Sequence, residues 1–199
     1  MSRNKGPMMK RMLFPVAALV ALSGCLSFGE DPPPFLMTLT ADTQVEAGAT
    51  RSAGIGQAIT IEKPDVPQAL VTNRLPVTTS DTSIAYLQNA LWVDTPNELL
   101  RALLAEVTAA RTGRVVLDPS QYHADPGTVV TGQLQRFGLD ARTRQVVIVY
   151  DAQLNGEGGV RTRRFEQREP VAAEDAGSVA NALNRAANRL AIEFSDWIA

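Results

Sequence analysis

Apolar side chains recur every three or four positions in two segments, residues 96–111 and 174–197, which predicts two amphipathic helices. Thr95 and Glu98 are spaced as a capping box at the start of the first helix, and Gly113 suits the left-handed position that ends it. Each helix therefore offers one apolar face to a core. In the second helix that face comprises Val179, Leu183, Ala186, Leu190, Phe194 and Trp197.

Segments rich in apolar and β-branched residues predict a sheet. The last three strands should be joined as hairpins, because the links between them are short and the second link is rich in glycine. The expected strands cover residues 35–41, 58–62, 75–77, 83–86, 114–117, 128–140, 145–154 and 160–170, and residues 42–56 form a long loop.

Two of these strands differ in how much water they should meet. Val146–Tyr150 is apolar on both faces, which is typical of a central strand covered on both sides. Arg161–Glu169 carries charged side chains around Phe165, so we expect it near an edge of the sheet. Two helices and a mostly antiparallel sheet predict a single α+β domain, with both helices packed on one face of the sheet.

The N-terminus has the layout of an export signal. Residues 1–11 carry basic and no acidic side chains, and the apolar run that follows, Met12–Leu22, is too short to span a membrane. The run closes with Leu22-Ser23-Gly24-Cys25, and Cys25 is the only cysteine of the chain. This arrangement resembles the lipobox of bacterial lipoproteins, in which the thiol takes diacylglycerol, the signal is cut before the cysteine, and the new amine is acylated. The alternative is a plain secreted protein with a spare thiol.

The lipobox resemblance implies a membrane-anchored protein of the cell envelope. Residues 1–24 would be removed, residues 25–34 would form a lipidated, proline-rich tether, and residues 35–199 would form the domain. The two chains of diacylglycerol hold a protein firmly, whereas a single chain binds only marginally. Leu26 stands where an aspartate would resemble an inner-membrane retention signal, so we expect attachment to the outer membrane, facing the periplasm.

The charge of the processed chain excludes one class of partner. The whole chain has 19 basic and 21 acidic side chains, and four of the basic ones leave with the signal, which gives a net charge of −6. A mildly acidic body argues against nucleic acid, which attracts clustered lysine and arginine.

The search for catalytic groups finds little. His123, the only histidine, lies in a polar loop, and a zinc site would need several histidine or cysteine ligands. Gly54-Ile55-Gly56 precedes a strand, whereas a dinucleotide-binding fingerprint follows one. Glu174-Asp175 lies at a helix start, where the helix dipole favours acids. We expect no enzyme, no metal and no cofactor apart from the diacylglycerol and N-acyl chain on Cys25.

Tyr86, Asn89 and Trp92 are the remaining candidate site residues. Tyrosine and tryptophan are enriched at interfaces, where one part of the ring is buried and the polar tip stays wet. The alternative is that both rings pack in the core against the following helix, with Asn89 forming a turn after the strand.

The same residues carry a family resemblance. Their order looks like the core signature of the ABC-type transport auxiliary lipoproteins, and the lipobox and the order of elements follow the same plan. That family often has aspartate and arginine at the positions of Gln88 and Leu91. The signature comprises Tyr86, Asn89, Trp92, Thr95-Pro96 and Leu99-Leu100.

The resemblance implies a non-catalytic accessory lipoprotein of an ABC transporter that carries an MCE-domain protein and moves phospholipids or similar amphiphiles across the envelope. Tyr86, Asn89 and Trp92 would contact the MCE partner. An alternative is a carrier that binds lipid in an apolar pocket of its own, and an envelope enzyme is the least favoured class.

Overall fold

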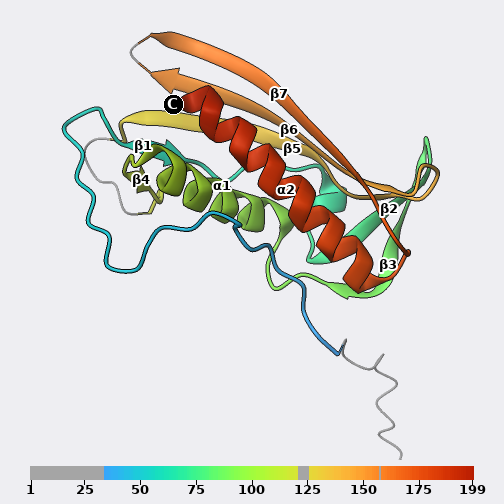
Figure 1. Ribbon diagram of the computed structural model, residues 1–199. Helices are drawn as coiled ribbons and strands as arrows, with labels where there is room; N and C mark the ends of the chain where they lie inside the picture. Colours follow the sequence, from blue (N-terminus) through green and yellow to red (C-terminus); the bar gives the residue numbers. More distant parts are fainter. Residues whose placement is uncertain (1–33, 121–125, 157) are drawn as a thin grey trace, which may run out of the picture. The chain divides into compact units, whose positions relative to one another are not determined.

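A computed structural model describes residues 34–120, 126–156 and 158–199 (Figure 1). Cys25, its signal, most of the tether and His123 lie outside these residues. The elements follow one another as β1 (Ile59–Ile61), the short 3-10 helix η1 (Gln68–Leu70), β2 (Arg74–Ser80), β3 (Ser83–Leu91), α1 (Pro96–Thr112), β4 (Val116–Leu117), β5 (Thr128–Asp140), β6 (Gln145–Gly156), β7 (Gly159–Pro170) and α2 (Ala176–Ile198).

The sheet has seven strands and is mixed, so the expectation of a mostly antiparallel sheet was wrong. β5, β6 and β7 form the predicted antiparallel meander, and β6 is the only strand of the described chain with which β7 pairs, which confirms β7 as an edge strand. On its other side β5 pairs in parallel with β1 at one end and with β2 at the other. The parallel pairing arises because the chain passes through α1 before it returns as β5, and such crossovers usually contain a helix.

The first expected strand, residues 35–41, does not form a ladder. Its only sheet contact among the described residues is a single parallel bridge between Met37 and Trp92. Met37 donates its backbone N–H to the Leu91 carbonyl and accepts from the Val93 N–H, both at 2.8 Å. The alternation of apolar side chains therefore predicted extended backbone correctly but not its pairing.

Side chains of α2 form hydrogen bonds with the backbone of this extended segment at residues 40 and 42. The backbone N–H groups of Thr40 and Asp42 donate to the side-chain oxygens of Asn184 and Asn188, each at 2.8 Å. Asn188 also donates to the Thr40 carbonyl at 2.9 Å. These two asparagines thus make hydrogen bonds of the kind that a neighbouring strand would make. The alternation of apolar residues in a strand does not predict such bonds.

The first helix ends as predicted but begins differently. Gly113 closes α1 with a φ of 70°. Thr95 has extended backbone at the N-cap and makes no side-chain cap hydrogen bond, so the capping box is absent. The Glu98 carboxylate binds the Arg101 guanidinium instead, with N–O distances of 2.7 and 2.9 Å.

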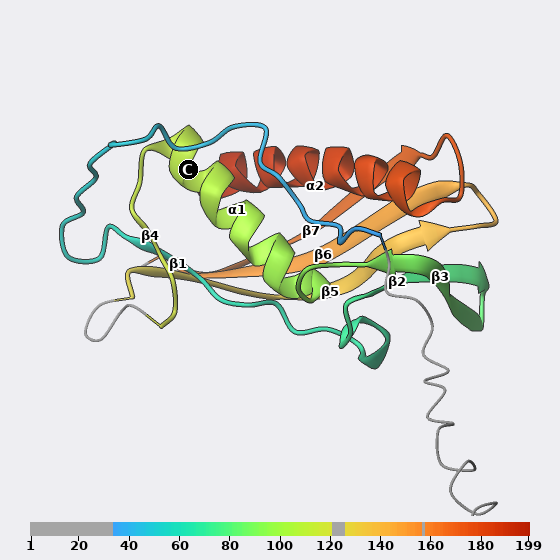
Figure 2. The same ribbon diagram turned by 90° about the horizontal axis from the view of Figure 1, so that it is seen from below.

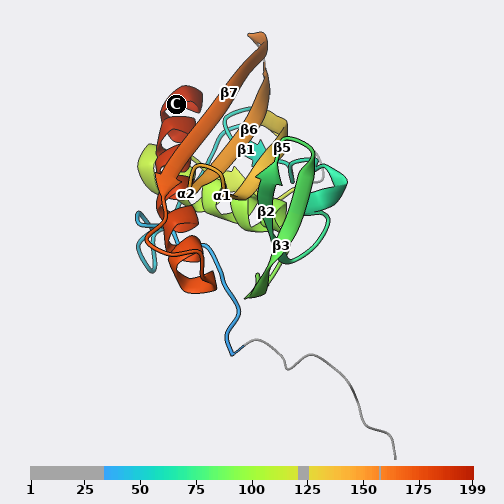
Figure 3. The ribbon, with the colours of Figure 1, turned by 90° about the vertical axis from the view of Figure 1, so that its right-hand side faces the viewer.

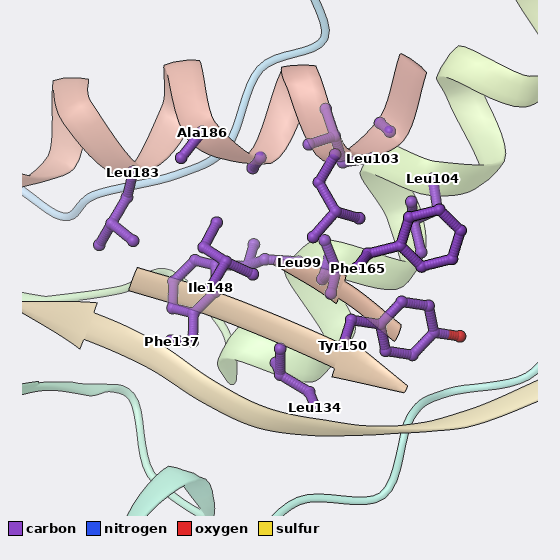
Figure 4. Packing of buried hydrophobic residues seen from close by; sticks show 14 of the residues in the cluster. Leu99, Leu103, Leu104, Leu134, Phe137, Ile148, Tyr150, Phe165, Leu183 and Ala186 are labelled. Carbon is purple, nitrogen blue, oxygen red and sulfur yellow. The ribbon is translucent and has the colours of Figure 1, made fainter. Parts of the chain in front are cut away.

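Both helices cover the same face of the sheet, as predicted (Figure 2). Figure 4 shows leucine side chains of α1 and α2 meeting residues of β5, β6 and β7 between the two layers. An aromatic group of Tyr150, Phe165, Phe194 and Trp197 joins α2 to β6 and β7, with ring centroids 5.7–6.4 Å apart. The described residues, from Pro34 to Ala199, form one compact unit around this core.

The other face of β6 is turned away from the core that both helices share, yet two of its valines are buried. Val147 and Val149 are buried on this face. The residues opposite them in the ladder include Arg136 on β5 and Glu166 and Arg168 on β7. Cross-strand neighbours lie close enough for long side chains to lie over the valines. The apolar run thus predicted burial correctly but not its cause.

Candidate functional site: a groove between β3 and the start of α2

The predicted partner-binding residues lie in and beside a large bulge of β3. Tyr86 pairs with Pro76 of β2, and the next pair along the strands joins Leu91 and Arg74. A single residue of β2 therefore faces four residues of β3, Leu87–Ala90. The extra residues bend β3 away from its partner, as bulges do.

Asn89 turns the backbone within this bulge. Its φ is 53°, in the left-handed region that asparagine tolerates better than most residues with a side chain. The sequence placed Asn89 at a turn after the strand, whereas the structure places it inside β3. Its side chain is exposed and faces the surface groove described below.

Tyr86 is half-buried at the start of the bulge. Its hydroxyl donates to the Ala69 carbonyl of η1 at 3.2 Å. The Arg74 guanidinium lies over its ring, 4.9 Å from the centroid. Tyr86 thus attaches β3 to η1 and leaves part of its ring accessible.

Trp92 lies just beyond the bulge and is fully buried. Its ring meets Phe137 of β5 edge to face, with centroids 5.5 Å apart, and its backbone N–H donates to the Asn73 carbonyl at 2.7 Å. The indole Nε1 has no hydrogen-bond partner among the residues described. Trp92 therefore supports the bulge from the core and presents no surface to a partner in this structure.

A groove of about 650 Å³ adjoins the bulge. Figure 3 shows the three segments that form it converging at one end of the molecule, where the described chain begins. They are Pro34–Phe35, residues 85–89 of β3 and residues 174–177 at the start of α2, and Val77 completes the lining. These segments are far apart in sequence, so sequence analysis found only the β3 wall.

The α2 wall of the groove carries the acids. Asp175 caps the helix, and the hydrogen bonds donated by the Ser178 backbone N–H and hydroxyl hold the pKa of its carboxyl below the ordinary value. Glu174 pairs with Arg144 at 3.6 Å. Asp175 is thus held by hydrogen bonds from Ser178 and Glu174 by an ion pair. The opposite walls of the groove are mainly apolar.

A second, larger groove of about 790 Å³ lies on the sheet face away from the helices. It is polar: Asp65, Gln133 and Gln153 line it, beside the ion pair of Asp151 with Arg164 at 2.6 and 2.7 Å. Hydrogen bonds from the Arg164 guanidinium hold the pKa of Asp151 below its ordinary value. Alternate polar positions on β5 and β6 were a sequence signal for this face, but none of the predicted site residues reaches it.

Other functional features are sparse in the described part of the chain. No group of three or more histidine, cysteine, aspartate or glutamate side chains there is placed to hold a metal ion. None of the helices seen there combines the length and apolar character needed to cross a membrane. The arrangement suits contact with another molecule at a groove.

Comparisons with solved structures show the same fold. One solved structure, an uncharacterized protein, has a TM-score of 0.65 at 20% identity and covers 75% of this chain and 97% of its own. A second, protein XCC0632 from Xanthomonas campestris of the family DUF330, has a TM-score of 0.62 at 18% identity and covers 82% and 93%. No curated protein matches the sequence.

The family comparison covers most of the domain. The model of the family described as "ABC-type transport auxiliary lipoprotein component" matches residues 38–194, which include β3, its bulge and both helices. A family of this description implies an accessory part in an ABC transport system at the cell envelope. The chain belongs to the ABC-type transport auxiliary lipoprotein component family.

Proposed function

We propose that this protein is a non-catalytic docking component of an MCE-type ABC transporter that moves phospholipids or similar amphiphiles across the envelope. One observation carries the proposal: a family match over residues 38–194 follows, after twelve residues (26–37), a lipobox that ends at Cys25. Acyl chains on Cys25 attach the protein to the outer membrane, and the domain faces the periplasm. The MCE-domain protein of the transporter is its partner.

The groove is the proposed docking surface. It lies where the described chain begins, so the tether places it at the membrane side of the domain. A conduit that delivers lipid has to reach the membrane, and a docking surface at this end is where such a conduit would arrive. Asn89 and the accessible part of Tyr86 form the contact, and Trp92 fixes their backbone from within the core.

Photocrosslinking tests this assignment. A photoreactive residue at Asn89, in protein expressed with its own transporter, should give an adduct with the MCE subunit. The same residue at Ile55, which is 96% exposed on a loop away from the groove, is the matched control and should give none. Equal labelling of the subunit from both positions, or no adduct from either, would contradict docking at the groove.

A second candidate function rests on the groove's lining. Its volume and apolar side chains suit one segment of an acyl chain, which favours a carrier that binds lipid itself. Native mass spectrometry of the protein, released gently from membranes, distinguishes the two functions. Stoichiometric phospholipid would favour the carrier, and a lipid-free protein that still captures the MCE subunit would favour docking alone.

A further inference from the structure

Two exposed apolar residues lie at the start of the described chain. Phe35 and Leu36 are 49% and 53% exposed, and Val93, whose backbone N–H donates to the Met37 carbonyl, is 52% exposed. Met37, the next residue, is buried. Its backbone hydrogen bonds to Leu91 and Val93, both 2.8 Å long, attach the chain to the end of β3 directly after this pair.

The pair lies close to the proposed acylation site along the chain. Eight residues separate Cys25 from Pro34, the first residue described. An extended chain of that length reaches no more than about 30 Å, and its prolines keep it stiff. Acylation of Cys25 would therefore hold Phe35 and Leu36 near the bilayer at a high effective concentration, so that a weak second contact can form.

We propose that Phe35, Leu36 and Val93 form a second membrane contact that lays the groove end of the domain on a phospholipid surface. The inference rests on the acylation of Cys25 in the proposed function. Three apolar side chains alone bind a bilayer weakly, so their effect is to orient a protein that its acyl chains already hold. The groove then opens at the lipid surface, and the β6–β7 hairpin, at the other end in Figures 1 and 3, points away from it.

The charges at this end favour a zwitterionic surface over an anionic one. Glu174 and Asp175 line the same groove as Phe35, and Arg144 pairs with only one of them, Glu174. Anionic headgroups would repel the remaining charge. We therefore expect closer contact on vesicles of phosphatidylethanolamine and phosphatidylcholine than on vesicles that also contain phosphatidylglycerol.

Depth-dependent fluorescence quenching tests the contact. Acylation blocks the only native thiol, so an engineered cysteine can be labelled alone with an environment-sensitive dye. The lipidated full-length protein, its acylation verified by intact mass, is placed in zwitterionic vesicles with spin-labelled phospholipid. Dye at Leu36→Cys should be quenched several-fold more than dye at Ile55→Cys or Val160→Cys, two exposed apolar positions in the long loop and at the start of β7.

A second variant tests whether the pair drives the contact. Dye at Gln88→Cys, on the groove rim, should also be quenched, and the added changes Phe35→Ser and Leu36→Ser should abolish most of that quenching. If the acylated protein shows equal quenching at positions 36, 55 and 160, the membrane contact is wrong and the anchoring proposal stands. If Cys25 carries no lipid, the anchoring proposal fails and the inference fails with it.

Discussion

At β3 the buried ring of Trp92 lies against Phe137, while Tyr86 is hydrogen-bonded to Ala69 of η1 and Asn89 turns the backbone between them. The sequence offered two interpretations of the aromatic pair, interface or core, because a large ring with one polar atom suits either. The structure assigns the two rings differently. Whether each ring is buried depends on where its residue lies in the sheet, and the spacing of the residues along the chain does not give that position.

Trp92→Ala should lower the free energy of unfolding by about 3–5 kcal/mol, because it removes a fully buried ring and leaves a cavity against Phe137. Urea denaturation measures this loss. Tyr86→Phe is the matched control: it removes one hydroxyl and its hydrogen bond, for about 0.5–1.5 kcal/mol. Equal losses in the two variants would contradict the assignment of Trp92 to the core.

Asn89→Val should destabilise the domain by about 1–2 kcal/mol, because a β-branched residue adopts the left-handed backbone poorly. Asn89→Gly keeps that backbone and should leave the unfolding midpoint nearly unchanged. The glycine variant also separates the two roles proposed for this residue. If it loses capture of the MCE subunit at full stability, the side chain contacts the partner. A valine variant as stable as the native protein would contradict the backbone role.

The pH dependence of stability should report on Asp140. Hydrogen bonds from Arg142, and then from Arg136, hold the pKa of this buried carboxyl well below its ordinary value. The unfolded chain takes up the proton near pH 4 and the folded chain only at lower pH, so stability is present above that range and is lost as the pH falls.

Asp140→Asn should therefore cost about 1.5–3 kcal/mol at pH 7 and flatten the fall in stability between about pH 5 and 2. Urea midpoints across that range measure both effects. An unchanged slope in the variant would show that Asp140 does not carry this dependence.

At the scale of helices and strands, sequence patterns predicted the features that depend on interactions between residues close together in the chain. The periodicity of α2, the stop at Gly113 and the β5–β6–β7 hairpins are confirmed because each depends on neighbours along the chain. The parallel pairing of β1 and β2 with β5 was missed, because it depends on where the chain goes after α1. The prediction of a capping box at the start of α1 was wrong, because the Glu98 carboxylate pairs with the Arg101 guanidinium instead.

The hydrogen bonds between the extended segment after Phe35 and α2 were also missed, because their partners lie far apart in the sequence. A substitution in α2 tests them. Asn188→Ala removes the acceptor for the Asp42 N–H and the donor to the Thr40 carbonyl, so the segment should loosen around residue 42, while Asn184 still accepts from the Thr40 N–H. The backbone amide hydrogen of Asp42 should then exchange markedly faster, with a loss of stability of about 1–3 kcal/mol. Asn181→Ala, an exposed asparagine of the same helix, is the control and should change neither. Unchanged exchange in the Asn188 variant would contradict this support.

At the scale of the whole molecule, the groove and the exposed pair Phe35 and Leu36 lie at the end where the described chain begins, and the β6–β7 hairpin lies at the other (Figures 1 and 3). Sequence predicted one wall of the groove through Tyr86 and Asn89. The other two walls come from the start of the domain and from the start of α2. Only the folded chain brings them together.

The intact mass of the protein purified from bacterial membranes tests the central claim, that acyl chains fasten this domain to the envelope beside a lipid transporter. The account predicts a chain that begins at Cys25 and is heavier than its 175 residues (199 − 24) by one diacylglycerol group and one N-linked acyl chain. A mature chain with an unmodified Cys25, or one that begins elsewhere, would contradict it.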